Sequence, residues 1–190
     1  MAEQSPRHLA IHSRMSQSTA NGPGTRSVIW VQGCDIGCYG CFNPETHAAD
    51  GSLHSVTTTE IAHWVRENAN DGLTVSGGEP LQQLEAVLEL GGMVKRFGKS
   101  VVVLTGFTHK QVLQRANHEQ LAEAFDVVIA GPYMASQHLA KSLRGSSNKE
   151  FLFFTDTYCL ESFSDIPDAE VIIDSDGSVT VTGVNVPLLK

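Results

Sequence analysis

The sequence has little charge, and the charge that it has is acidic. Charged residues make up 18% of the 190 positions, with 21 Asp and Glu against 13 Lys and Arg, which gives a formal net charge of −8. A protein that tracks nucleic-acid phosphates needs a basic stripe, and binding to an anionic membrane surface also needs clustered positive charge. The composition therefore argues against nucleic acids and membranes as partners.

Long apolar runs are also missing. The longest, such as residues 101–104, have the length of a strand, whereas a helix that crosses a bilayer needs about 20 apolar residues. Residues 1–17 are polar and lack the apolar segment of a secretory signal. We therefore expect a cytoplasmic protein, with residues 1–17 as a polar N-terminal arm and residues 18–190 as a single domain.

Hydrophobic residues, at 41% of the chain, are by contrast plentiful. A chain of this length buries roughly 70% of its unfolded surface, which is enough for a core without a disulfide framework. Length and composition thus predict a folded globular protein and exclude intrinsic disorder of the whole chain.

Cysteine is scarce, and its spacing is uneven. Cys34, Cys38 and Cys41 lie in one glycine-studded stretch, and Cys159 lies far from them in the sequence. In a reducing compartment, three neighbouring thiols favour metal ligation over disulfides. A structural zinc site needs four protein ligands and would recruit Cys159 or a histidine such as His47. A 4Fe-4S cluster can use three thiolates and keep one iron open, so spacing alone allows both metals.

Segments with strand and helix patterns alternate along most of the chain. Strands are expected at residues 27–32, 73–76, 99–105 and 126–130, and helical periodicity at residues 57–65, 81–90 and 109–124. Thr58 and Thr59 are the expected caps of the first helix. This alternation predicts an α/β fold with a parallel sheet. Residues 171–173 and 179–182 flank an Asp/Ser/Gly turn at residues 174–178 and predict a small C-terminal β-hairpin.

Two loops follow strands of the predicted sheet. The cysteine loop comes directly after residues 27–32, and Gly77-Gly78-Glu79-Pro80 comes directly after residues 73–76. Because the carboxyl ends of parallel strands meet at one edge of a sheet, the two loops can converge on one ligand. Gly-Gly-Glu-Pro alone is typical of a strand-to-helix turn, so only the combination of both loops indicates a site.

Together, the two loops resemble the radical S-adenosylmethionine enzymes. Residues 21–26, 40–47 and 144–148 further resemble the activating enzymes of anaerobic ribonucleotide reductase, a branch of the glycyl-radical enzyme activases. The resemblance covers roughly residues 20 to 150 and implies a partial (β/α) barrel with a parallel sheet. Two positions depart from this branch: Ala130 stands where an acidic residue is expected, and Lys149 stands where these activases usually have Gln.

The resemblance implies two cofactors. Cys34, Cys38 and Cys41 would hold three irons of a 4Fe-4S cluster, and the fourth iron would bind S-adenosylmethionine, which the reduced cluster cleaves to methionine and a 5'-deoxyadenosyl radical. Gly77 and Gly78 would let the backbone approach that ligand closely.

Further cofactor contacts are expected from the same loops. Glu79 would face the ligand and accept hydrogen bonds from its ammonium group. Thr105 would reach the ribose, and Tyr39, Gly40 and Phe42 would lie against adenine or simply pack within the loop.

Three functions stay open at this point. The resemblance favours an oxidoreductase that installs a glycyl radical on a partner such as anaerobic ribonucleotide reductase, with flavodoxin or ferredoxin as the one-electron donor. The first alternative is a radical enzyme that modifies a peptide or another protein, and the second is a zinc-stabilised binding module without catalysis. Asn21 and residues 144–148 could contact a ligand or partner or form plain loops, and Cys159 could be a filler or an auxiliary ligand.

Overall fold

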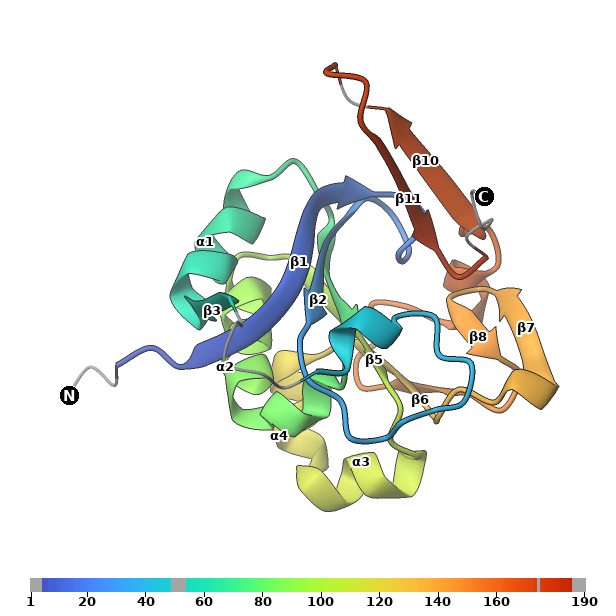
Figure 1. Ribbon diagram of the computed structural model, residues 1–190. Helices are drawn as coiled ribbons and strands as arrows, with labels where there is room; N and C mark the ends of the chain where they lie inside the picture. The colour runs from blue at the N-terminus through green and yellow to red at the C-terminus, as the bar shows by residue number, and fades with distance from the viewer. Residues whose placement is uncertain (1–4, 49–53, 174, 186–190) are drawn as a thin grey trace.

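A seven-stranded sheet organises the computed structural model, which describes residues 5–48, 54–173 and 175–185 (Figure 1). The strand order is β3-β1-β2-β4-β5-β6-β9, and the four central strands β2, β4, β5 and β6 run parallel. The strands are β1 (His8–Ser18), β2 (Arg26–Val31), β3 (His54–Thr57), β4 (Gly72–Gly77), β5 (Ser100–Thr105), β6 (Val127–Ala130) and β9 (Glu150–Phe153). The predicted α/β fold with a parallel sheet is confirmed.

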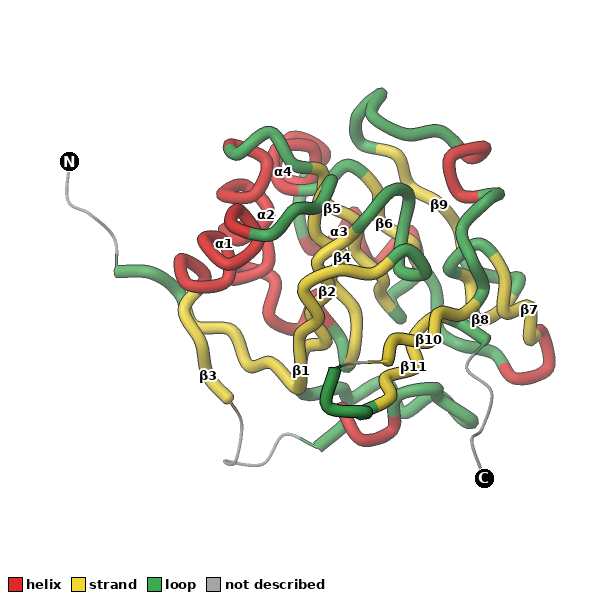
Figure 2. The backbone as a smooth tube through the Cα atoms, turned by 90° about the horizontal axis from the view of Figure 1, so that it is seen from above, coloured by secondary structure: helices red, strands yellow, loops and turns green. Residues whose placement is uncertain are grey.

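The helices lie on one side of this sheet, and the C-terminal hairpin lies on the other (Figure 2). The helices are α1 (Thr58–Glu67), α2 (Leu84–Arg96), α3 (His109–Arg115) and α4 (His118–Ala124), with 3-10 turns η1 (Pro44–Thr46), η2 (Pro80–Gln83), η3 (Ala135–Gln137) and η4 (Leu160–Phe163). None of the helices in the described ranges combines the length and apolar character that crossing a membrane needs.

Two small sheets complete the fold. One pairs β7 (His138–Lys141) with β8 (Arg144–Ser146), and the other pairs β10 (Ala169–Ile173) with β11 (Val179–Gly183). The predicted C-terminal hairpin is therefore confirmed, although residue 174 of its expected turn lies outside the described residues. The hairpin projects from the body of the molecule (Figure 1).

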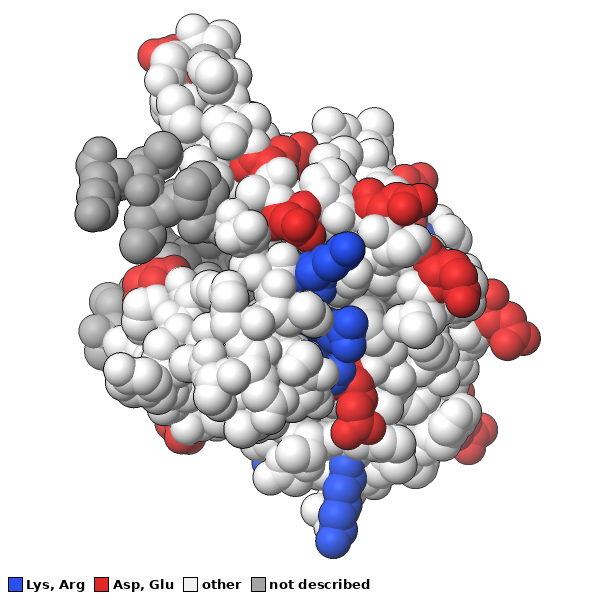
Figure 3. All heavy atoms as spheres, turned by 90° about the vertical axis from the view of Figure 1, so that its right-hand side faces the viewer, with Lys and Arg blue, Asp and Glu red and all other residues white. Residues whose placement is uncertain are grey.

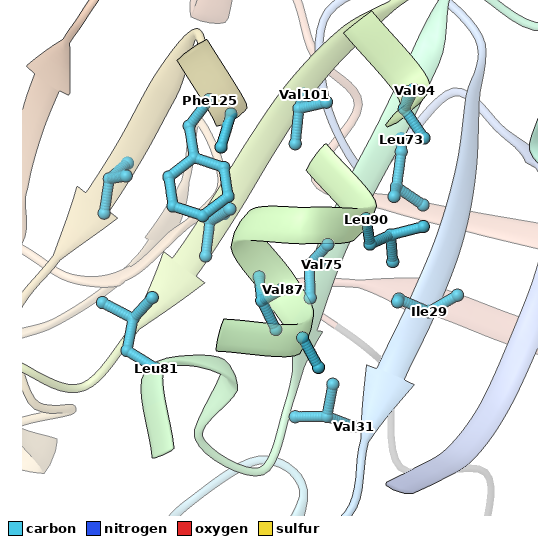
Figure 4. Packing of buried hydrophobic residues seen from close by; sticks show 14 of the residues in the cluster. Ile29, Val31, Leu73, Val75, Leu81, Val87, Leu90, Val94, Val101 and Phe125 are labelled. Atoms are coloured by element: carbon cyan, nitrogen blue, oxygen red, sulfur yellow. The ribbon is translucent and has the colours of Figure 1, made fainter. Parts of the chain in front are cut away.

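Strand residues alternate between two buried layers. In β5, Val101 and Val103 face the helices, whereas Val102 faces a second apolar cluster with Leu143 and Phe163. Both faces of the central strands are covered, which explains why these strands are apolar throughout. Figure 4 shows the layer between sheet and helix, with Ile29, Val31, Leu73, Val75 and Val101 from the strands and Val87, Leu90 and Val94 from α2. Each such side chain contributes about 1.5–3 kcal/mol when it is fully buried.

Two helix boundaries differ from the sequence expectation. Helix α1 is capped by Thr57, not by Thr58 or Thr59, because the Thr57 hydroxyl and the Glu60 side chain form a reciprocal capping box. Helix α2 continues through the Gly91-Gly92 pair to Arg96. A Cβ at Gly91 would lie 2.4 Å from the carbonyl oxygen of Ala124, so this glycine permits close contact with α4 and does not end the helix.

Residues 109–124 form two helices instead of one. Helix α3 ends at Arg115, and Asn117 caps α4 by accepting a hydrogen bond from the Gln120 amide at 2.9 Å. Asparagine at position 117 favours the start of a new helix over continuation of α3, because its side-chain oxygen accepts from a first-turn amide that has no backbone acceptor.

The prediction of a polar arm over residues 1–17 is wrong for residues 8–17, because they belong to strand β1. Residues 1–4 of the predicted arm lie outside the described residues. Strand β1 pairs with β2 on one side and with β3 on the other, both antiparallel. Leu9 and Ile11 are buried in the main core, whereas Ala10 and residues 12–17 are half-buried or exposed. A strand with one face toward water alternates in polarity, which made this segment look like an arm.

The face that carries the hairpin has mixed surface charge. Figure 3 shows Lys and Arg side chains interspersed with Asp and Glu on this side of the molecule. A partner that docks on the described part of this face therefore meets both signs of charge, and shape has to contribute to recognition along with electrostatics.

Asp126, at the start of β6, is a buried carboxylate with several donors. It accepts hydrogen bonds from the Val101 amide at 2.8 Å and from the Thr155 hydroxyl at 2.7 Å, and it forms an ion pair with Lys95 at 3.0 Å. Burial by itself raises the pKa of Asp126, but these donors outweigh burial and hold the pKa below its ordinary value of 3.8. The carboxylate therefore stabilises the fold above that pH and loses its contribution as the pH falls.

Asp126→Asn is expected to lower the free energy of unfolding by about 1.5–3 kcal/mol near pH 7, because hydrogen bonds to a charged acceptor are lost. Urea unfolding at pH 7 and at pH 3 measures the difference, which should narrow at the lower pH as the wild-type carboxylate takes up its proton. The exposed Asp156 provides the control variant Asp156→Asn, which should match the wild type. An Asp126→Asn deficit that is equal at both pH values would contradict the assignment.

Candidate metal and cofactor site

A cavity of about 390 Å³ lies at the carboxyl end of the parallel strands. The residues expected at a site that line it are Cys34, Cys38, Cys41, Phe42, Gly77, Gly78, Glu79 and Thr105. These residues come from the loops after β2, β4 and β5, so the predicted convergence of two loops at one sheet edge is found, with a third loop beside them. A cavity of this volume suits a small-molecule ligand.

The cysteine loop is anchored at its start by backbone hydrogen bonds. The Gly33 amide donates to the Thr46 carbonyl at 2.8 Å, and the Cys34 amide donates to the His47 carbonyl at 3.2 Å. Near its end, the Cys41 amide donates to the Cys38 carbonyl at 3.2 Å. These backbone hydrogen bonds hold the chain between β2 and η1 in a closed loop. The loop places the three thiols on one wall of the cavity.

The three thiols are half-buried and form no disulfide. Burial raises the pKa of the Cys41 thiol, and the Cys38 and Cys34 sulfurs raise it further. Thiolates in this loop therefore need a positive partner, which a bound metal centre supplies.

The donor set fits a cluster better than a single zinc ion. Among the described residues, no group of three or more His, Cys, Asp and Glu side chains converges closely enough to hold one metal ion. Cys159 is exposed, caps η4 and lies 3.6 Å from the Ser162 hydroxyl, away from the cavity lining. A cubane cluster spreads three thiolates over three irons and needs no fourth protein ligand, which matches the three cysteines of this loop.

Gly77 and Gly78 join the two loops through their backbones. Gly77 has a φ of 101°, and a Cβ there would lie 2.5 Å from the Val31 nitrogen. A Cβ at Gly78 would lie 2.3 Å from the Gly33 carbonyl oxygen, while the Gly78 amide donates to the Val31 carbonyl at 2.8 Å. Both positions require glycine because the chain approaches the backbone of β2 closely at Gly77 and the start of the cysteine loop closely at Gly78.

Glu79 is fully buried, and its carboxylate is already engaged by the protein. Oε1 accepts from the Leu81 amide at 2.9 Å and from the Thr105 hydroxyl at 2.6 Å, and Oε2 accepts from the Gly106 amide at 2.7 Å. The sequence predicted a ligand-facing carboxylate. In the structure the carboxylate caps η2 and ties the end of β4 to the end of β5, so Glu79 has a structural part, and its ligand-facing role stays a prediction.

Thr105 and Phe42 both line the cavity, as the sequence predicted for site residues. Thr105 lines the cavity, but its hydroxyl donates to Glu79 and accepts from the Phe107 amide at 3.0 Å. The Phe42 ring also lines the cavity, with its centroid 4.7 Å from that of Tyr133.

Two predicted adenine contacts lie outside the cavity lining. Tyr39 is 89% exposed, and Gly40 has a φ of 73° with its Cβ position 3.6 Å from the Tyr133 ring. Gly40 therefore serves the turn between the second and third cysteines, where a positive φ favours glycine.

Several cavity residues were missed by sequence reasoning. Trp30 and Ser76 line it from β2 and β4, Lys149 lines it from the segment before β9, and residues 180–184 line it from the hairpin. Strand alternation could have identified Trp30 and Ser76, because they lie on the opposite face from the helix-facing positions. The hairpin and Lys149 depend on long-range packing.

The hairpin is held at the cavity by a polar network around Asn21. The Asn21 side-chain amide donates to the hydroxyls of Ser18 and Thr182, each at 2.8 Å. Glu170 accepts from the Ser18 hydroxyl at 2.7 Å and from the Thr19 amide at 3.0 Å. Asn21 thus fixes the hairpin to the loop between β1 and β2.

Residues 144–148 form β8 and the turn after it, and this turn-containing loop region packs beside the cysteine loop. The Arg144 guanidinium lies 5.4 Å from the centroid of the Phe151 ring, and the Asn148 amide donates to the Pro132 carbonyl at 2.9 Å. A Cβ at Gly145 would lie 2.4 Å from the Phe42 ring, so this loop supports one of the aromatic side chains of the cavity.

Comparisons with known proteins identify the family of this chain. Residues 20–152 match the family described as a 4Fe-4S single cluster domain. The anaerobic ribonucleoside-triphosphate reductase-activating protein of Enterobacteria phage T4 is 35% identical over 142 residues, which cover 72% of this chain and 88% of that protein. The pyruvate formate-lyase-activating enzyme of Staphylococcus epidermidis is 28% identical over 152 residues, which cover 76% of this chain and 61% of that enzyme. The chain therefore spans less than two thirds of the latter's length.

Among solved structures, QueE from Escherichia coli superimposes with a TM-score of 0.48 and 17% identity, over 54% of each chain. The family match covers more than half of this chain, and the phage protein is matched over most of its length. The chain belongs to the 4Fe-4S single cluster domain family, in the branch of radical S-adenosylmethionine activating enzymes.

Proposed function

We propose that this protein reductively cleaves S-adenosylmethionine and uses the product to install a glycyl radical on a partner enzyme, such as anaerobic ribonucleoside-triphosphate reductase. A 4Fe-4S cluster held by Cys34, Cys38 and Cys41 would supply the one electron that cleaves S-adenosylmethionine to methionine and a 5'-deoxyadenosyl radical, and that radical would take a hydrogen atom from a glycine Cα of the partner. One observation carries the proposal: Cys34, Cys38 and Cys41 line one cavity, and the described residues form no ligand group that would hold a single metal ion.

The chain's own residues supply position and shelter. Cys34, Cys38 and Cys41 would hold the cluster, and the backbone of Gly77 and Gly78 would form the adjacent wall. Residues 180–184 of the hairpin line another part of the cavity, which would limit the access of water and leave an opening for a partner's loop. A dry site protects a reactive species from side reactions.

The relatives favour a protein as the substrate. The phage protein and the staphylococcal enzyme are both named for activating another enzyme. The electron donor, flavodoxin or ferredoxin, and a location in the cytoplasm remain predictions from the sequence. A radical enzyme that modifies a peptide is the second candidate, favoured by the departures at Ala130 and Lys149.

Anaerobic reconstitution tests the proposal directly. We expect a brown protein with about four irons per chain, which with dithionite and S-adenosylmethionine forms 5'-deoxyadenosine. On addition of a candidate reductase, we expect an organic radical signal in electron paramagnetic resonance, with hyperfine splitting that collapses when the partner's glycine is deuterated at Cα.

The alternatives give different results in the same experiment. A colourless protein with stoichiometric zinc would contradict the proposal and support a binding module. Formation of 5'-deoxyadenosine without a radical on the reductase, together with a mass change on a peptide, would support the second candidate.

A further inference from the structure

Lys149 is a half-buried cation in the wall of the cavity. Its Nζ donates to the Thr105 carbonyl at 3.2 Å and to the Gly131 carbonyl, which lie at the end of β5 and just beyond β6. Its side chain lines the same cavity as the three cysteines. Lys149 therefore holds a fixed position at the sheet edge where the cluster is expected.

The charge of Lys149 acts on this cavity. Burial lowers the pKa of Lys149, while attraction to Glu79 opposes that effect. The sulfurs of Cys38 and Cys41 also attract the ammonium group. The donors of Glu79 are two backbone amides and a hydroxyl, which leave its negative charge in place, so the Lys149 charge acts on Glu79 and on the two cysteines together.

The hydrogen bonds of Lys149 do not account for its charge. An ammonium group has three donors, and the two backbone carbonyls take two of them. A neutral donor such as glutamine could serve such carbonyls without the cost of removing a charge from water. The charge of Lys149 therefore matters for the negative groups that it attracts, which are Glu79 and the sulfurs of Cys38 and Cys41.

We propose that Lys149 is a positioning residue whose charge raises the reduction potential of the cluster held by Cys34, Cys38 and Cys41. The inference rests on the proposed function, since it takes the cluster as the group in the cavity. One-electron reduction, with the electron supplied by an external donor, adds one negative charge and makes or breaks no bond in the chain. A nearby cation stabilises the more negative state, and low solvent exposure strengthens that effect.

Lys99 provides a matched control. Its Nζ donates to the carbonyls of Asn68 at 3.1 Å and Asn70 at 2.7 Å, so it ties backbone segments together as Lys149 does. It lies just before β5, at the opposite end of the sheet, and is not part of the cavity lining. Lys99→Gln removes a comparable tether without changing the charge at the cavity.

The test compares Lys149→Gln, Lys149→Met, Lys149→Arg and Lys99→Gln by redox titration of the reconstituted cluster, without S-adenosylmethionine. We expect the two neutral variants at position 149 to shift the oxidised-to-reduced ratio about tenfold toward the oxidised form, a fall of about 59 mV for one electron. Lys149→Arg and Lys99→Gln should keep the wild-type potential. Iron content and thermal unfolding are measured alongside.

Three outcomes would overturn the inference. A wild-type potential in both neutral variants would show that the charge has no effect, and a fall of equal size in Lys149→Arg would show that geometry is responsible. If both neutral variants fold without iron but fail to assemble the cluster, Lys149 is needed for assembly and the proposed effect on the potential is wrong. A wild-type protein with a normal redox couple that fails to cleave S-adenosylmethionine would contradict the proposed function and leave this inference intact.

Discussion

Replacing Cys34, Cys38 or Cys41 with alanine is expected to abolish the cluster, whereas Cys159→Ala is expected to keep it. The first three sulfurs line one cavity, and Cys159 is exposed beside Ser162 outside its lining. Each of the three variants should fall from about four irons per chain to essentially none. Iron analysis and visible absorbance of anaerobically reconstituted protein measure the effect.

The variants are expected to fold, so that loss of iron can be assigned to the missing thiolate. The loop keeps its shape through backbone bonds, such as that from the Gly33 amide to the Thr46 carbonyl, and these bonds do not involve the sulfurs. Thermal unfolding of the metal-free proteins provides the control. Loss of iron from Cys159→Ala would show that the ligand set assigned here is wrong.

The sequence was most informative for strands that are buried on both faces. The expected strand at residues 99–105 matches β5 within one residue, and residues 73–76 lie inside β4 (Gly72–Gly77). Such strands are apolar and β-branched throughout, so they are visible without knowledge of their neighbours. The loops at their carboxyl ends, and with them the three cysteines, could be located for the same reason.

The sequence was least informative where partners distant in the chain decide the structure. Strand β1 has one exposed face, and only its pairing with β2 and β3 makes it part of the sheet. Glu79 lines the cavity, but its carboxylate accepts hydrogen bonds from Thr105 and Gly106, which follow 26 and 27 residues later. Spacing cannot show that those donors fold back onto it.

Glu79→Gln is expected to destabilise the fold before it affects any ligand. The amide oxygen of glutamine can replace Oε1, but its NH2 group would face the Gly106 amide, which now donates to Oε2. A buried donor that meets another donor costs about 1–3 kcal/mol. For a chain of this size, each kcal/mol corresponds to a fall in the melting temperature of about 2–4 °C.

The loss should depend on pH in a defined direction. Burial raises the pKa of Glu79 above its ordinary value of 4.5, although hydrogen bonds from Thr105, Gly106 and Leu81 oppose the effect. A carboxyl group with a raised pKa contributes its full stability below the unfolded pKa and loses stability as the pH rises through the folded pKa. Glutamine does not titrate, so the deficit of Glu79→Gln should be larger near pH 5 than near pH 8.

Thr105→Val and Thr105→Ser separate the structural role of Glu79 from ligand binding. Valine removes the hydroxyl that donates to Oε1, whereas serine keeps it, so only valine should reproduce part of the Glu79→Gln deficit. The two changes share a hydrogen bond, and the double variant should therefore lose less stability than the sum of the single losses.

S-adenosylmethionine affinity, compared at matched iron content, completes the test. An unchanged melting temperature together with lost affinity would return Glu79 to the ligand-facing role that its motif predicts, because a carboxylate that only ties β4 to β5 cannot be replaced without a loss of stability.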